Sequence, residues 1–236
     1  MTDLTEACEF VSSSLAEVGD PVKAPQMQAY MKTEMPFYGV QKAGRTPIVR
    51  ELVKRFPPAD GDDYERLVLA LWELPHREEK YVALAVARHF KNHIAPERLH
   101  LYQRLIVEAA WSAWWDLVDE VATKLIRPLV VGYPDDTWPT VDQWVDDDDM
   151  WLRRTAVICQ IGAKDATDAR RLFDFCAARA HEKDFFIRKA IGWALREYAR
   201  VDPEAVADFI NSHLEELSGL SYREASKHIQ HLVDPR

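Results

Sequence analysis

The chain has 236 residues, 47% of them hydrophobic and 29% charged, a balance that supports a packed core and excludes a largely disordered protein. Its net charge of −9 excludes a uniformly basic nucleic-acid-binding surface, although basic residues could still gather on one face. The three cysteines are odd in number and far apart, which excludes a disulfide framework and indicates a reducing compartment.

The first residues, MTDLTEACEF, do not resemble a signal peptide, and no run of about 18 apolar residues predicts a membrane span. We therefore expect a cytoplasmic protein without a membrane partner. The predicted elements are helices. Thr46 is expected to cap a helix that begins at Pro47.

Six further stretches repeat apolar residues at three- and four-residue spacing, which is typical of amphipathic helices. They are residues 62–74, 77–90, 97–111, 151–162, 168–180 and 184–201. Their connections are short, so neighbouring helices should be antiparallel. The sequence therefore predicts an all-α fold of about a dozen helices.

The sequence also carries a weak internal repeat. Arg154-Thr-Ala156, Arg188-Lys-Ala190 and Arg223-Glu-Ala225 each lie early in a helix, and their arginines are 34 and 35 residues apart. A period of this length is typical of stacked helical hairpins that form a curved superhelix with a concave face. Such a face suits a long partner, namely a protein, a peptide or a duplex.

The stretch WSAWWDLVDE, residues 111–120, combines tryptophans with carboxylates. Residues four apart share a helix face, which aligns Trp111, Trp115 and Asp119. The opposite side supplies an apolar stripe for the core: Trp114, Leu117, Val118 and Val121. Two interpretations remain open, because Trp115 and Asp119 could form a site or could pack and pair with a neighbouring repeat.

A second helix places polar groups around a tryptophan. Lys189, Trp193 and Arg196 share a face, while the core is supplied by Phe186, Ala190, Ile191, Ala194 and Leu195. Arg153 and Arg154 point about 100° apart, so that one of them can face the groove. These cations either join a site or form surface ion pairs.

Two other patterns favour ordinary structural roles. His89 and His93 have the spacing of zinc ligands but lack companion ligands, so we expect no metal site. The acidic run Asp146–Asp149 is expected to begin the helix that follows it. No glycine-rich phosphate loop is present, and we expect no cofactor.

Six motifs in order resemble the AlkD family of DNA glycosylases, over Met27 to His228. They are QAYMKTEMPFYGVQ, LWELPHREEKYVALAV, SAWWDLVD, MWLRRTAV, FFIRKAIGWALREYAR and SYREASKHI. The resemblance implies one domain over residues 1–236, a curved right-handed solenoid of HEAT-like antiparallel helical hairpins. It also implies excision of cationic alkylated purines, 3-methyladenine and 7-methylguanine, from duplex DNA by a monomer that does not flip the base.

Family roles transfer to five positions of this sequence. The resemblance implies that Asp119 is the catalytic carboxylate, that Trp115 and Trp193 cradle the sugar, that Arg154 binds phosphate and that Tyr30 lies at the cleft edge. A carboxylate in this place would stabilise the positive charge that develops on the sugar as the glycosidic bond breaks.

The alternative is a non-catalytic helical-repeat protein that binds DNA structures or a protein partner. Such a binder gains nothing from a carboxylate that faces phosphates, whereas a glycosylase requires one. For the glycosylase, we expect a concave face that is positive despite the net charge, with contributions from Arg154, Lys189 and Arg196.

Overall fold

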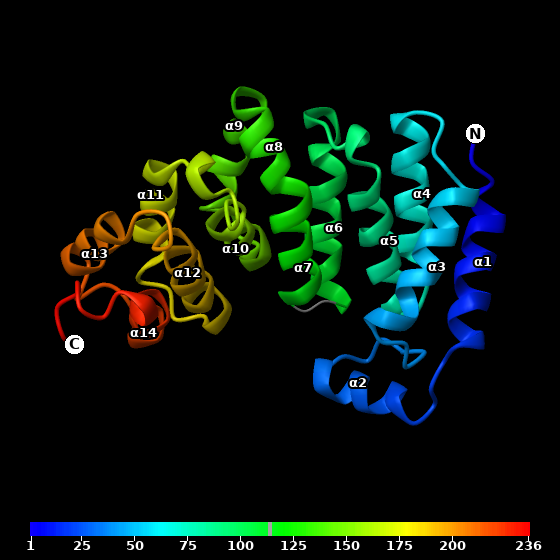
Figure 1. Cartoon of the computed structure of the whole chain (residues 1–236), viewed down its shortest axis with the longest axis horizontal. Coiled ribbons are helices and arrows are strands. Elements are labelled where there is room, and N and C mark those ends of the chain that lie inside the picture. The colour runs from blue at the N-terminus through cyan, green and yellow to red at the C-terminus, as the bar shows by residue number, and fades with distance from the viewer. Residues whose placement is uncertain (113–114) are drawn as a thin grey trace. The chain divides into compact units, whose positions relative to one another are not determined.

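The computed structural model describes residues 1–112 and 115–236, without the side chains of residues 109–112 (Figure 1). The described residues form helices and turns and no strand, which confirms the all-α prediction. They divide into two compact units, Met1–Leu117 (unit 1) and Val118–Arg236 (unit 2). A single domain over residues 1–236 stays a prediction. None of the described helices is long and apolar enough to span a membrane.

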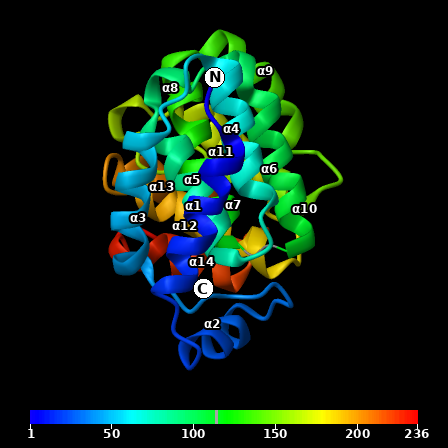
Figure 2. The same ribbon diagram turned by 90° about the vertical axis from the view of Figure 1, so that its right-hand side faces the viewer.

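Unit 1 consists of helices joined by short turns. They are α1 (Leu4–Glu17), α2 (Lys23–Met31), α3 (Lys42–Arg55), α4 (Gly61–Glu73), α5 (Arg77–His89), the 3₁₀ turns η1 (Lys91–His93) and η2 (Pro96–Arg98), α6 (Leu99–Ser112), and the start of α7 (Trp115–Val121). α1 packs against both α3 and α4, and Figure 2 shows it between them. α4 and α5 form a closely packed pair, as expected for helices joined by a tight connection.

The start of α3 differs from the prediction. The helix begins at Lys42 rather than Pro47, so Pro47 lies inside it and Thr46 is not its N-cap. The carbonyl of Gln41 accepts hydrogen bonds from the N–H groups of Gly44 and Arg45, which closes a helical turn before the proline. Pro47 lies beyond the first turn of α3 and has no N–H, so it cannot donate the i→i−4 hydrogen bond to the carbonyl of Ala43.

The first turn of α5 forms a buried polar centre in unit 1. Arg77, Glu78, Glu79 and Lys80 are all buried. The carboxylate of Glu78 accepts hydrogen bonds from three consecutive backbone N–H groups, those of residues 38–40. Buried charges need such partners, because an unpaired carboxylate in the core would be strongly destabilising. This contact fixes the loop between α2 and α3.

Unit 2 continues the helical pattern. After the end of α7 it contains the π-helical segment η3 (Ala122–Ile126), α8 (Arg127–Gly132), α9 (Pro134–Trp144), α10 (Met150–Ile158), η4 (Lys164–Ala166), α11 (Ala169–Arg179), α12 (Phe185–Tyr198), α13 (Pro203–Ser212), α14 (Gly219–Ala225) and η5 (Ser226–His228). α10 packs on α12, and α12 packs on α14 (Figure 1). These are the three helices that carry the predicted repeat.

The register of the repeat differs by one residue from the predicted one, which matched Arg154 with Arg188. Asp149 and Asp184 cap α10 and α12 and lie 35 positions apart. Arg154 therefore occupies the same position in its helix as Lys189 does in the next, and not that of Arg188. The starts of the helices, and not matching letters, therefore give the register in which α10 and α12 correspond.

The π-helical segment begins three residues after Asp119 and has a cause in the sequence. Buried apolar residues come in pairs at a spacing of four from residue 117 to residue 130. An α-helix has about 3.6 residues per turn, so a spacing of four drifts around its axis. The wider π turn, in which the N–H of Arg127 donates to the carbonyl of Ala122, offsets part of this drift. It keeps both ends of the helix facing the core.

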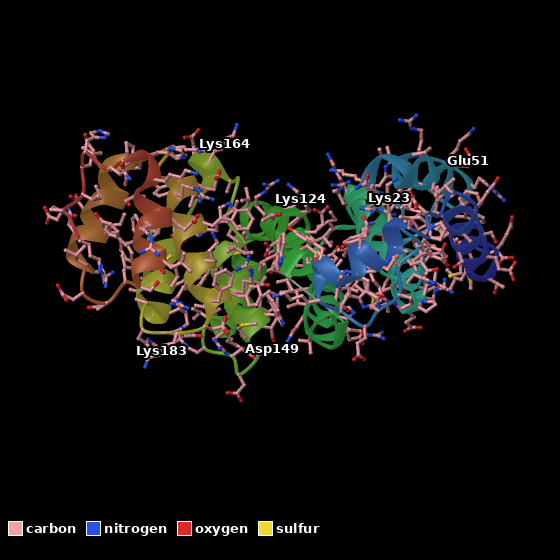
Figure 3. The ribbon with its side chains drawn as sticks, turned by 90° about the horizontal axis from the view of Figure 1, so that it is seen from below. Lys23, Glu51, Lys124, Asp149, Lys164 and Lys183 are labelled. Atoms are coloured by element: carbon pink, nitrogen blue, oxygen red, sulfur yellow. The ribbon has the colours of Figure 1, made fainter. Side chains whose placement is uncertain are left out.

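Cations project from more than one edge of unit 2. Lys164 follows α10 and Lys183 precedes α12, and their side chains point to opposite edges (Figure 3). Exposed lysines alone therefore do not define a binding face within this unit. Side chains fixed by hydrogen bonds and ion pairs define the candidate site better.

Candidate functional site

The helices that carry the candidate residues begin at side-chain caps. Asp149 accepts hydrogen bonds from the N–H groups of Trp151 and Leu152 at the start of α10. Asp184 accepts one from Phe186 at the start of α12. Caps of this kind stabilise a helix by about 1 kcal/mol and fix where it begins. The prediction that the acidic run begins the following helix is confirmed for Asp149.

Asp119 and Arg154 form the most closely defined polar pair among the candidates. Nε and Nη2 of Arg154 donate to Oδ1 and Oδ2 of Asp119, each over 2.9 Å. The Arg154 side chain is 5% exposed and the Asp119 side chain 13% exposed. Nη1 of Arg154 donates to the carbonyl of Phe186 at 2.6 Å, which links the pair to α12. The two hydrogen bonds from Arg154 fix the orientation of the Asp119 carboxylate. Part of the Asp119 side chain remains exposed to solvent.

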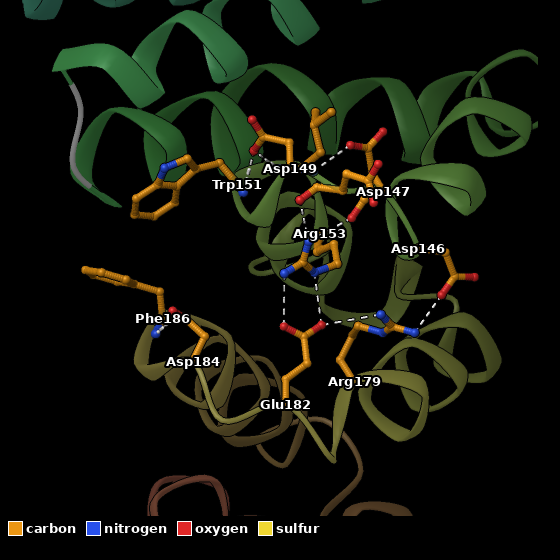
Figure 4. Close-up of polar contacts among 11 residues, drawn as sticks. Asp146, Asp147, Asp149, Trp151, Arg153, Arg179, Glu182, Asp184 and Phe186 are labelled. Atoms are coloured by element: carbon orange, nitrogen blue, oxygen red, sulfur yellow. Dashed lines mark hydrogen bonds and ion pairs between the residues drawn. The ribbon is translucent and has the colours of Figure 1, made fainter.

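Arg153 points elsewhere and belongs to a separate cluster (Figure 4). It makes two hydrogen bonds to Glu182, at 3.0 and 3.1 Å, and donates to the carbonyl of Asp147. Glu182 also contacts Arg179, which pairs with Asp146. This network holds the loop before α10 against the loop before α12. Of the two adjacent arginines, Arg154 is the one that donates to Asp119.

Lys189 and Arg196 are brought together by a residue that the sequence did not single out. Nζ of Lys189 lies 2.9 Å from Oε1 of Glu224, and Nη1 of Arg196 donates to Oε2 of the same carboxylate. Both cations lower the pKa of Glu224 below its usual value, mainly through their hydrogen bonds, while burial opposes them. Trp193 lies between the two cations on α12 and is half-buried.

Trp115 begins α7 and its side chain is 40% exposed. It precedes Asp119 by four residues, one helical turn, as predicted. The next residue, Asp116, has a structural role in unit 1. It accepts hydrogen bonds from Nη2 of Arg77 at 2.5 Å and from the hydroxyl of Tyr81 at 2.6 Å. Burial and the neighbouring Asp116 raise the pKa of Tyr81 above its usual range.

Other predicted positions have simpler surroundings. Tyr30 lies in α2 of unit 1 and is 77% exposed. Leu117, Val118 and Val121 are buried, which confirms the core stripe of α7. The core residues predicted for α12 are buried except Phe186, which is partly exposed. Trp114 and the side chain of Trp111 lie outside the described residues.

The candidate residues line no part of the cavity in unit 2. Within the part of the chain that the structure describes, no group of His, Cys, Asp or Glu is arranged to hold a metal ion. His93 instead stacks on Tyr64, with ring centroids 5.4 Å apart. A cavity of about 390 Å³ in unit 2 is lined by the ends of α10 and α12, including Gln160 and Tyr198. None of the predicted site residues lines it.

The chain matches the model of a known protein family over most of its length. The model of the family described as DNA alkylation repair enzyme matches residues 11–229. The chain belongs to this family. The match supports the resemblance to AlkD that the sequence motifs indicated, and it makes the protein a DNA alkylation repair enzyme by family.

Solved structures agree with this assignment. A predicted DNA alkylation repair enzyme from Enterococcus faecalis is 28% identical, with a TM-score of 0.76 over 89% of this chain and 96% of that one. Two structures from Streptococcus mutans, smu.31 and AlkD2, are each 14% identical with TM-scores of 0.59. They cover 79% of this chain and 91% and 89% of their own chains, and they support the fold alone. No curated protein matches the chain.

Three residues that contact the motifs of interest were not predicted from the sequence. Glu224 lies within SYREASKHI, 35 residues after Lys189, which is about the length of the repeat. Arg77 begins the run REEK and Tyr81 follows it. Such a run of charges suggests a solvated helix face rather than the buried contact to Asp116. The pair of Lys189 and Glu224 is predictable as two opposite charges separated by one repeat length.

Proposed function

We propose that this chain is a DNA glycosylase that excises cationic alkylated purines, such as 3-methyladenine and 7-methylguanine, from duplex DNA. The observation that carries the proposal is the Asp119 carboxylate. Arg154 donates hydrogen bonds to both oxygens of this carboxylate at 2.9 Å. Asp119 follows the exposed Trp115 by one helical turn. Membership of the DNA alkylation repair family supports the assignment of the substrate class.

The reaction requires little of the leaving group. When the bond between C1′ and the alkylated purine breaks, its electron pair moves to the purine, whose positive charge is neutralised. The sugar then carries the charge, and water adds its hydroxyl to C1′ while its proton is released. A fixed carboxylate beside C1′ stabilises this cation and orients the water. Asp119 is assigned this role.

Trp115 and Trp193 keep the sugar-cradling roles that the resemblance to AlkD implies. Trp115 is 40% exposed and Trp193 is half-buried, so both retain surface that a ligand can contact. Aromatic faces attract a nearby cation and exclude water, which strengthens the effect of the carboxylate. Because the bond to a cationic purine is already weak, we propose that the lesion reacts within the duplex without being flipped into a pocket.

The remaining proposed contacts are to DNA. Tyr30, Lys189 and Arg196 are assigned to the backbone of the duplex, in line with the sequence prediction. Arg154 keeps the predicted phosphate contact, but its hydrogen bonds to Asp119 and Phe186 already engage three of the five N–H groups of its guanidinium. We therefore assign it a second role, which is to orient Asp119.

The decisive experiment is incubation of the protein with duplex DNA that has been methylated to carry both lesions. Release of free 3-methyladenine and 7-methylguanine is the expected result, and Asp119→Asn is the matched inactive protein. Duplex binding without release by the wild-type protein would instead identify a non-catalytic helical-repeat binder. In that case the Asp119–Arg154 pair would serve only to join α7 to α10.

A further inference from the structure

The carboxylate of Glu224 accepts hydrogen bonds from both cations that flank Trp193. Lys189 lies four residues before the tryptophan and Arg196 three residues after it, on the same face of α12. Their charged ends converge on the two oxygens of Glu224 in α14. The Lys189 side chain is 37% exposed, that of Arg196 20% and that of Glu224 25%, so the three groups lie at the surface of unit 2 and are reachable from solvent.

Close packing of the two helices holds Glu224 in place. A Cβ atom added to Gly192 would lie 2.5 Å from Cβ of Glu224 and 3.1 Å from the carbonyl oxygen of Ser221, so only glycine fits there without a shift. The hydroxyl of Ser221 donates to the carbonyl of Arg188 at 3.0 Å and adds a second contact between α14 and α12. Glu224 is therefore positioned by the backbones of both helices.

We propose that Glu224 weakens duplex binding by competing with DNA phosphates for Lys189 and Arg196. Its carboxylate occupies the position that a phosphate oxygen would take against either cation. A duplex that binds at this face must exchange one anion for another, so each cation contributes less to affinity than a free cation does. The effect lowers affinity for any duplex, including undamaged DNA, which would otherwise retain the enzyme away from lesions. This inference rests on the proposed function.

The test is the Glu224→Gln substitution, which keeps the size of the side chain and removes its charge. Both cations then become available to phosphates, and each added phosphate contact steepens the slope of log K against log salt by about 0.9. We expect the slope for undamaged duplex to steepen by up to about 1.8, and affinity at low salt to rise roughly tenfold. Thermal melting establishes that the variant is folded.

Two further variants identify the cause. Glu204→Gln removes the same charge from an exposed position in α13 and should leave the salt slope unchanged. Adding Lys189→Gln to Glu224→Gln should remove about half of the gain in slope, since one of the two released cations is lost. An equal gain in Glu204→Gln would show that net charge alone acts, and this result would overturn the inference.

The outcomes separate this inference from the proposed function. If wild-type protein binds duplex and Glu224→Gln binds with unchanged slope or lower affinity, Glu224 serves only to join α12 and α14, and the inference is wrong while the function stands. If neither protein binds duplex at any salt concentration, the assignment of this face to DNA is wrong, and the inference is overturned with it.

Discussion

The side chains of Asp119 and Arg154 lie 35 residues apart in sequence and form two parallel hydrogen bonds, each of 2.9 Å, between α7 and α10 of unit 2. Paired contacts of this geometry are the strongest that a guanidinium makes with a carboxylate, and they fix direction as well as distance. The pair therefore gives the carboxylate a defined orientation before any substrate binds.

Asp119→Asn should fold, bind damaged duplex and lose excision. The amide is nearly the same size as the carboxylate but carries no charge to stabilise the sugar cation. By analogy with the loss of one oxyanion-hole donor, the barrier should rise by about 2.7–4 kcal/mol, roughly a hundred- to a thousand-fold in rate. Single-turnover excision measures this step, and circular dichroism establishes the fold. Excision at the wild-type rate by a folded variant would assign Asp119 a structural role.

Asp116→Asn is the matched control, because it makes the same chemical change three residues earlier in α7. Asp116 is bound by Arg77 and Tyr81 within unit 1, so its replacement weakens a charged contact of the fold. We expect a loss of stability of about 1.5–3 kcal/mol. Excision by the folded fraction should stay within a few-fold of wild type. A loss of excision as large as that of Asp119→Asn would show that both carboxylates take part in the reaction.

Arg154→Lys tests whether Arg154 acts mainly on Asp119 or on phosphate. Lysine keeps the charge but cannot form two parallel hydrogen bonds to one carboxylate. Loss of one charged hydrogen bond corresponds to about 1.5–3 kcal/mol, so excision should fall roughly ten- to a hundred-fold. Duplex affinity and its salt dependence should change little. Normal excision combined with weaker DNA binding would instead favour the predicted phosphate contact as the principal role.

Thr123→Val tests the contribution of the π-helical segment. The hydroxyl of Thr123, a residue that is 7% exposed, donates to the carbonyl of Asp119 at 2.7 Å. Valine removes the donor, which should lower the free energy of unfolding by about 1 kcal/mol and reduce excision by less than Asp119→Asn does.

Thr137→Val is the control for that substitution. Thr137 is also buried, but its hydroxyl has no hydrogen-bond partner among the described residues. The same change there should leave the free energy of unfolding equal or higher, because no hydrogen bond is lost and a buried polar atom is removed. Denaturant unfolding of the two variants gives the comparison. Equal losses of stability would mean that the contact between Thr123 and Asp119 contributes nothing.

Acid should destabilise unit 1 through Asp63. Burial alone would raise the pKa of this carboxyl, but hydrogen bonds from the N–H of Ala59 and from Thr2 outweigh it and lower the pKa from 3.8 to about 2. The folded chain therefore binds fewer protons than the unfolded chain in this range. The stability contributed by Asp63 is present above pH 3.8 and is lost as the pH falls toward about 2.

Asp63→Asn removes this contribution. Its free energy of unfolding at neutral pH should be lower than that of the wild type, and the difference should shrink between about pH 4 and pH 2. Urea unfolding followed by circular dichroism at a series of pH values measures both curves. A difference that stays constant across this range would show that the carboxyl does not titrate as its contacts indicate.

Much of the fold follows from local patterns in the sequence. Apolar residues at three- and four-residue spacing identified the helices because one face of each must be buried. Leu117, Val118 and Val121 are buried as that pattern predicted. Where local patterns were ambiguous, the prediction was wrong: Thr46-Pro47 resembles a helix start, yet α3 begins at Lys42 because the Gln41 carbonyl closes an earlier turn.

What the sequence by itself determined is the set of helices, their buried faces and the candidate residues that share a helix turn, such as Trp115 with Asp119. The tertiary structure decided which charges meet. Asp116 and Asp119 are both acidic residues of one motif, but one pairs with Arg77 and the other with Arg154. Lys189 and Arg196 share Glu224, which no local pattern indicates. The physical reason is that spacing along one helix fixes direction, whereas a partner 35 residues away depends on how neighbouring helices pack.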